Sequence, residues 1–346
     1  MLSVSIHARA MAIAPFLCIS GKDEARGDGL ERMTGSSETH KGQDVQVDLI
    51  AVLVSVVAGA PCVLTIRGGH MLPSGPFELE HRSLQSSLRA WVERQTGHSV
   101  GYIEQLYTFA DRDRITDDRA RRAISISYLG LTRADELKAQ PSSGWGGWYD
   151  YFPWEDRRNG VPAVESDIIE PRLRGWAQSA SGTGPRAERW QRAASVFGFE
   201  DHAWNEELAL QRYELLHEAG LVQEAYGEAP PVENLVPGIP MFADHRRILA
   251  TAIARLRTKI KYRPVVFELM PPIFTLLQLQ RAVEALSGRP VHKQNFRRLI
   301  EQQELVEETG EVAADTGGRP AKLFRFRAAV HLERTFLGTR LPITRS

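Results

Sequence analysis

The stretch that decides the fold is residues 275–303, TLLQLQRAVEALSGRPVHKQNFRRLIEQQ. Its apolar residues recur at helical spacing over Thr275–Ser287, and Gly288 predicts the end of that helix. After a short turn, a second helix is predicted over His292–Gln303. Two helices joined by a turn are the core of several nucleic-acid-binding folds.

The flanking residues complete this pattern. Upstream, an apolar stripe over Asp244–Lys261 predicts another helix, for which Asp244 is a possible cap. Downstream, Leu305–Glu311 and Ala321–Arg327 are strand-like arms around a Gly-rich tip, Asp315–Arg319. Three helices followed by a β-hairpin predict a winged helix-turn-helix.

The helix over His292–Gln303 is predicted to be the recognition helix. At about 100° per residue, its apolar side chains form one face and its basic and amide side chains form the other. Such side chains reach phosphates and the acceptor edge of guanine in a major groove. The alternative is a solvated basic helix without a partner. The predicted DNA-contacting residues, two of them on the wing, are His292, Lys293, Gln294, Arg297, Arg298, Arg319 and Lys322.

The charge distribution favours DNA over the solvated alternative. The whole chain balances 43 basic residues against 43 acidic ones. Residues 241–330, however, contain 16 Lys and Arg against 9 Asp and Glu, whereas residues 1–240 contain 24 against 33. The C-terminal part therefore suits an anionic partner.

The N-terminal part alternates between strand and helix patterns. The predicted strands are Val47–Val56, Pro61–Arg67, Tyr102–Phe109 and Ala123–Leu131. The predicted helices are Leu84–Gln95, Ala187–Val196 and Trp204–Ala219. A mixed sheet with a helix packed on it is the simplest assembly.

Length and composition limit the classes further. A chain of 346 residues predicts two domains, and we divide it into a tail or over-long start (1–45), an α/β domain (46–225), a Pro-rich linker (226–241), the winged helix (242–330) and a C-terminal tail (331–346). Cys18 and Cys62 are the only cysteines, which excludes a disulfide framework and a Cys-based zinc site and fits the cytoplasm. No apolar run reaches the length of a membrane span, so a soluble protein is expected.

The segment from Leu72 to Gly97 resembles the loop, helix and loop of the Nudix phosphohydrolase motif, whose helix carboxylates bind the catalytic magnesium. Anchoring that motif on Gly97 puts Trp91, Arg94 and Gln95 at the metal positions. Anchoring it on Gly75 puts Ala90, Glu93 and Arg94 there. Either register leaves at most one carboxylate, so we expect no metal site and no hydrolase activity.

A longer resemblance covers about residues 47–327. The C-terminal stretches ADHRRILATAIARLRTKIKYRPVVFELMPPIF and GRPAKLFRFR, together with residues 275–303, resemble the Nudix-related transcriptional regulators of NAD metabolism, the NrtR family. The stretches YIEQLYTFADRDR, AISISYLGLTR and GWGGWYDYFPWEDRRNG resemble its NadQ branch. The resemblance implies a catalytically degenerate Nudix-like α/β/α sandwich, within an α+β or α/β class, followed by a winged helix-turn-helix. It also implies a homodimeric repressor of NAD biosynthesis or salvage genes, with operator DNA as partner, no required cofactor, and NAD, ADP-ribose or ATP as effector.

The candidate effector site includes an aromatic run. Six aromatic residues lie between Trp145 and Trp154, and the intervening glycines predict a loop rather than a strand. Its rings are expected either to cover the core or to stack on a base. The candidate effector-binding residues are Arg67, Glu104, Tyr107, Tyr128, Trp145, Trp148 and Arg157. For those on strands, packing is the alternative.

The stripe over Asp244–Lys261 is a candidate for coupling. Leu249 and Ile253 are predicted to contact a partner helix in a dimer, and the alternative is that the stripe packs on the core of its own chain. Two other functions remain open: an active hydrolase of ADP-ribose or a related nucleoside diphosphate with an appended DNA-binding domain, and a module whose winged helix binds a protein. Absent metal carboxylates argue against the first, and the basic helix face argues against the second.

Overall fold

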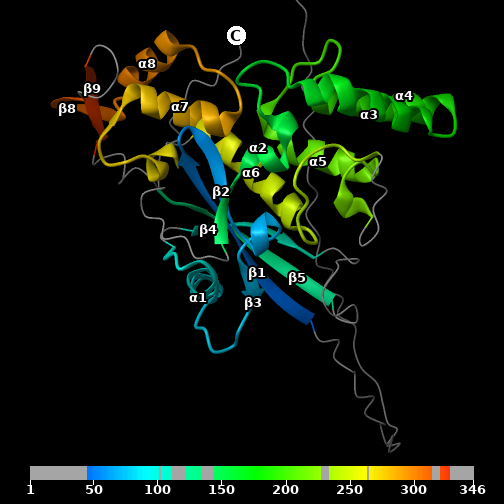
Figure 1. Ribbon diagram of the computed structural model, residues 1–346, viewed down its shortest axis with the longest axis horizontal. Helices are drawn as coiled ribbons and strands as arrows, with labels where there is room; N and C mark the ends of the chain where they lie inside the picture. The colour runs from blue at the N-terminus through cyan, green and yellow to red at the C-terminus, as the bar shows by residue number, and fades with distance from the viewer. Residues whose placement is uncertain are drawn as a thin grey trace, which may run out of the picture. The chain divides into compact units, whose positions relative to one another are not determined.

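The computed structural model describes residues 45–100, 103–110, 122–133, 143–226, 234–262, 265–313 and 320–327 (Figure 1). The predicted tails, the wing tip at 315–319 and much of the Pro-rich segment lie outside these residues. In the part of the chain that is described, no helix has the length and apolar character needed to cross a bilayer.

A mixed sheet forms the centre of the N-terminal part, as predicted. Its strand order is β4-β5-β1-β2-β6, with β3 paired to β1. β1 is parallel to β5 and antiparallel to β2 and β3. The strands are β1 (Val45–Val57), β2 (Ala60–Ile66), β3 (Ser74–Pro76), β4 (Ile103–Phe109), β5 (Arg122–Leu131) and β6 (Ser143–Gly147).

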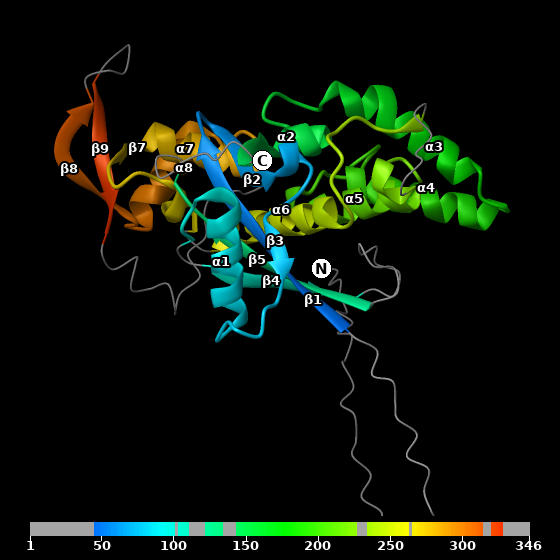
Figure 2. The same cartoon turned by 60° about the horizontal axis from the view of Figure 1, so that its bottom comes forward.

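The two faces of the sheet are covered by different helices (Figure 2). Side chains alternate between the faces of a strand. Leu49, Ala51 and Leu53 of β1 therefore pack with α1 (Leu84–Thr96), while Ile50 and its alternate neighbours pack in the larger core with α6 (His245–Tyr262). The predicted α/β/α sandwich is thus confirmed.

The segment after β6 differs from its prediction. The aromatic run is not a loop: it forms β6, α2 (Trp148–Tyr151) and a 3₁₀ turn, η3 (Pro153–Glu155). The glycines of β6 are compatible with a strand, and one of them allows close packing against the Tyr151 ring. A Cβ on Gly146 would lie only 2.6 Å from the Tyr151 hydroxyl. Glycine here marks close packing rather than a loop.

A helical region follows and covers residues 165–225. The sequence predicted two helices there, and the structure adds another, α3, and extends the next one at its N-terminal end. The elements are η4 (Glu165–Ile169), α3 (Glu170–Gln178), α4 (Thr183–Phe197), η5 (Glu206–Leu208), α5 (Ala209–Glu218) and η6 (Gln223–Ala225). α3 and α4 lie side by side (Figure 1).

The C-terminal part has the predicted order of helices and hairpin. Thr275 caps α7 through a capping box with Gln278, and Gly288 ends it in the left-handed conformation. A short strand, β7, pairs with β9 and completes a three-stranded sheet. The elements are η8 (Val265–Leu269), β7 (Phe274–Thr275), α7 (Leu276–Ser287), α8 (Lys293–Gln302), β8 (Val306–Ala313) and β9 (Ala321–Phe326).

α6 corrects the predicted coupling surface. Leu249 and Ile253 are 0% and 1% exposed and belong to the core of their own chain. The prediction that they contact a partner helix is therefore wrong, because almost none of either side chain is exposed. α6 contacts both α5, before the Pro-rich segment, and α7, after it. The domain boundary at 226–241 stays a prediction.

Candidate functional site

A pocket of about 580 Å³ opens at the edge of the sheet where β2 ends. Its walls come from β2, the turn after it, the end of α1, and β6 with α2. The lining residues are Thr65, Ile66, Arg67, Gly68, Gly69, Arg94, Gln95, Ser143, Gly144, Trp145, Gly146, Tyr151 and Ile239. A volume of this size is typical of small-molecule sites.

The turn after β2 places main chain at the pocket. Arg67, Gly68 and Gly69 have positive φ angles of 51°, 68° and 96°, so the chain reverses within three residues. The Tyr151 hydroxyl donates a 2.8 Å hydrogen bond to the Gly69 carbonyl and fixes this turn. The Arg67 side chain is exposed. The pocket therefore has a constrained backbone wall with a cation beside it.

The chemistry of the lining favours an anionic, planar ligand. Arg67 and Arg94 supply positive charge, and Trp145 and Tyr151 supply aromatic surface. None of the lining residues is Asp, Glu or His. Across the described residues, no group of three or more His, Cys, Asp or Glu side chains is arranged to hold a metal ion.

The residues that the register anchored on Gly97 puts at the metal positions have a structural use here. Gln95 binds the Ser74 main chain twice, at 3.1 and 2.7 Å. The Trp91 indole donates to the Pro76 carbonyl at 2.9 Å, and its ring packs on Gly75 so closely that a side chain there would overlap it. Arg94 lies over the Trp91 ring at 4.4 Å from its centroid. These residues fasten β3 to α1.

The structure brings only two of the seven predicted effector residues, Arg67 and Trp145, into this pocket. Glu104, Tyr107 and Tyr128 lie on β4 and β5, beyond β1 and away from the pocket at β2 and β6. Tyr107 is exposed on the edge strand, and Glu104 forms an ion pair with Lys259 of α6. Strand pairing order, which the sequence did not reveal, separates these residues from the site.

Three of the predicted effector residues are corrected because they lie outside the pocket lining: two are buried in the core, and the third is partly buried and held in an ion pair. Tyr128 is 3% exposed beneath α1, and burial raises its pKa. Trp148 is 0% exposed in the larger core. Arg157 forms an ion pair with Glu165 inside the protein. Sequence reasoning missed Tyr151, Gly68 and Gly69 as pocket residues. The glycine pair directly after the predicted strand Pro61–Arg67 was the available signal for the turn.

A second candidate site is the outer face of α8. Phe296 and Ile300 are fully buried, as predicted for its inner face. The predicted contact residues on its outer face are all exposed: His292, Lys293, Gln294, Arg297 and Arg298. On the wing, Lys322 is exposed but paired with Glu308 at 2.8 Å, and Arg319 lies outside the described residues.

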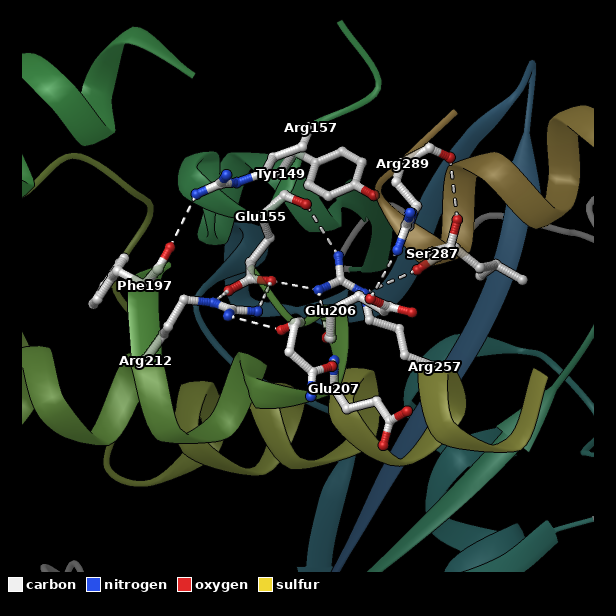
Figure 3. A network of polar contacts seen from close by, with 12 residues as sticks. Tyr149, Glu155, Arg157, Phe197, Glu206, Glu207, Arg212, Arg257, Ser287 and Arg289 are labelled. Atoms are coloured by element: carbon white, nitrogen blue, oxygen red, sulfur yellow. Dashed lines mark hydrogen bonds and ion pairs between the residues drawn. The ribbon is translucent and has the colours of Figure 1, made fainter. Parts of the chain in front are cut away.

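A buried ionic network joins the sheet region to the C-terminal part (Figure 3). The Glu155 carboxylate binds Arg212, at 2.5 and 2.9 Å, and Arg257. All three residues are 0% exposed. Burial alone would raise the pKa of Glu155, but the two arginines outweigh it and hold that pKa below its ordinary value.

The network continues toward α7. Glu206 is 3% exposed and pairs with Lys261 at 2.7 Å and Arg289 at 3.4 Å. The Tyr149 hydroxyl donates to the Ala285 carbonyl at 2.6 Å, and burial raises the pKa of Tyr149 to about 12 although Arg257 opposes the shift. Tyr149 therefore remains a donor at neutral pH.

Fold and sites define a class: a Nudix-like sandwich with a cationic pocket, followed by a winged helix with an exposed basic helix. Residues 266–326 match the family model of the NrtR DNA-binding winged helix domain. A curated relative, the ADPR responsive transcriptional repressor NtrR of Acinetobacter baylyi, is 42% identical over 83 residues. That match covers 24% of this chain. In it, the chain spans about 33% of the relative's length.

Solved structures agree with the fold. Shewanella oneidensis NrtR superposes with a TM-score of 0.51 at 18% identity, covering 86% of this chain and 99% of that one. The same protein complexed with a 27mer DNA gives a TM-score of 0.50 at 20% identity, covering 84% and 98%. This chain therefore has the fold of NrtR and is similar in sequence to an NtrR repressor over 83 residues. The NadQ branch stays a prediction.

Proposed function

We propose that the protein is a nucleotide-responsive transcriptional repressor, in which the winged helix binds operator DNA and the pocket at β2 binds the effector. The observation that carries the proposal is the winged-helix match at 266–326 together with the exposed basic face of α8. The fold-level likeness to NrtR supports the assignment of DNA as its partner.

ADP-ribose is the effector that the pocket chemistry and the relative's name support best. Arg67 and Arg94 both line the pocket and would neutralise a diphosphate, since one guanidinium group can donate two parallel hydrogen bonds to phosphate oxygens. Trp145 offers a planar surface for a base. NAD and ATP share both features and remain the other effectors to test.

We infer that the pocket binds without hydrolysing. In the register anchored on Gly97, Trp91 and Gln95 hold β3 where metal ligands would be needed, and in the register anchored on Gly75 only Glu93 is a carboxylate. Repression of NAD biosynthesis or salvage genes, a homodimeric state and work in the cytoplasm belong to the same proposal. A dimer is expected because a two-fold operator needs two recognition helices about one helical turn apart.

The decisive experiment starts from DNA chosen by the protein itself. Duplexes are selected from a random library by the purified protein, and the affinity for the winning duplex is then measured with and without ADP-ribose, NAD and ATP. We expect sequence-specific binding that ADP-ribose changes. Binding that is equal for all duplexes would contradict the regulator and favour a protein-interaction module.

Arginine variants test the pocket. Arg67→Ala and Arg94→Ala each remove a lining cation and are expected to weaken ADP-ribose binding at least about tenfold, since charge-assisted hydrogen bonds contribute about 1.5–3 kcal/mol. Arg82→Ala removes an exposed arginine outside the pocket and serves as the matched control. Unchanged affinity in both pocket variants would show that the effector binds elsewhere.

A further inference from the structure

One continuous segment, residues 143–158, lies against both the pocket and the winged helix. On the pocket side, β6 contributes Trp145 and Gly146 to the lining and α2 contributes Tyr151. On the other side, the same segment contacts the end of α7 (Figure 3). Tyr149 thus lies between two pocket residues in sequence and still reaches the winged helix.

The contacts to α7 are made at its C-terminal carbonyls. The Tyr149 hydroxyl donates to the Ala285 carbonyl at 2.6 Å, and the Arg157 amide donates to the Gly288 carbonyl at 2.7 Å. Arg257, itself bound by Glu155, donates to the Leu286 carbonyl at 3.1 Å. A helix leaves its last carbonyls without internal partners, so donors supplied here fix the end of α7.

The fixed end of α7 leads directly to α8. Gly288 has a φ of 73°, and a side chain on it would overlap the Glu155 carbonyl and the Arg257 guanidinium. The turn from Gly288 to His292 is held further by the Val291 amide, which donates to Glu284 at 2.9 Å. A displacement of residues 149–157 must therefore displace the turn that carries α8.

We propose that residues 143–158 transmit occupancy of the pocket to α8, with the bond between the Tyr149 hydroxyl and the Ala285 carbonyl as the contact that differs between the ligand-bound and ligand-free states. The inference rests on the proposed function, because it needs a ligand in the pocket and DNA on α8. A ligand shifts an equilibrium only through contacts that differ between the two states. One neutral hydrogen bond changes such an equilibrium by about 2- to 10-fold.

Tyr149→Phe tests the contact because it removes the hydroxyl and keeps the ring. The matched control is Tyr226→Phe, which removes a hydroxyl that donates to the Gly220 carbonyl at 2.7 Å, outside the pocket lining and the α7 contacts. For each protein, the dissociation constant of the selected duplex is measured with and without ADP-ribose. The ratio of the two constants should fall about 2- to 10-fold in Tyr149→Phe and stay at the wild-type value in Tyr226→Phe.

A second measurement uses the wild-type protein and does not depend on a variant that folds. Hydrogen exchange of the amides in residues 285–292 should change when ADP-ribose is added. Unchanged exchange there, or a wild-type ratio in folded Tyr149→Phe, overturns the link through this segment. A wild-type protein that binds neither ADP-ribose nor any selected duplex overturns the proposed function itself. One that binds both independently overturns only the transmission.

Discussion

Replacing Glu155 by Gln is expected to destabilise the protein more than any other single neutralisation of an ion pair described above. The substitution keeps the shape of the side chain and removes the charge that holds Arg212 and Arg257, both 0% exposed. Removing one member of a buried ion pair costs about 3–5 kcal/mol, since the remaining charge is left without compensation. With a midpoint shift of about 2–4 °C per kcal/mol, the melting temperature should fall by about 6–20 °C.

Thermal unfolding followed by circular dichroism at pH 7 measures this effect. Glu170→Gln is the matched control, because its pair with Arg174 is exposed, at 31% and 44% of the two side chains. An exposed pair contributes about 0–1 kcal/mol, so this variant should melt within about 4 °C of the wild type. Equal shifts in the two variants would refute the argument from burial.

The wild type and Glu155→Gln also differ in a defined direction in how their melting temperatures depend on pH. The arginines hold the pKa of Glu155 below its ordinary value in the folded state. Its contribution to stability is therefore full above the unfolded pKa of about 4.5 and is lost as the pH falls through the lower folded pKa. The difference in melting temperature between wild type and Glu155→Gln should shrink below about pH 4.5. A difference that grows on acidification would contradict the assigned ionisation.

Three further outcomes are expected. Arg297→Ala should weaken binding to the selected duplex by about 1–3 kcal/mol and relax the preference for one base. Lys322→Ala should weaken binding to all duplexes alike. Identical specificity profiles in the two variants would place α8 outside the groove. Gly146→Ala should weaken ADP-ribose binding in calorimetry because its Cβ would lie 2.6 Å from the Tyr151 hydroxyl. The control is Gly175→Ala, which lies outside the pocket lining, has no atom within 4 Å of its Cβ and should bind normally. The protein incubated with ADP-ribose and magnesium should release AMP at well below about one turnover per second, and a faster rate would establish the hydrolase alternative.

Local pattern predicted the elements whose signal is contained within the segment itself. The periodicity of α7 and α8, the helix end at Gly288, and the β-branched runs of β1 and β2 all correspond to elements in the structure. Phe296 and Ile300 lie on the buried side of α8 because amphipathic spacing determines which face meets the core.

Partners distant in sequence could not be predicted in the same way. The apolar stripe of α6 has the same spacing whether it packs on its own core or on another chain, so Leu249 and Ile253 were assigned to the wrong surface. The pocket depends on the pairing of β2 with β6, which brings Trp145 into the same lining as Arg67, whereas Tyr107 lies on β4 at the opposite edge of the sheet. No local pattern encodes these neighbours.

The ionic network also bears on the order in which the chain becomes stable during synthesis. Glu155 emerges from the ribosome before Arg212 and long before Arg257, which follows 102 residues later. The second of the two arginines that compensate the buried carboxylate is therefore available only after α6 has been synthesised. α6 supplies this arginine and also contacts β1 and β4 on the face of the sheet opposite α1. A fragment cut at the Pro-rich segment would lack both. We therefore expect the smallest fragment of the N-terminal part that folds to extend through α6, the first helix beyond the Pro-rich segment.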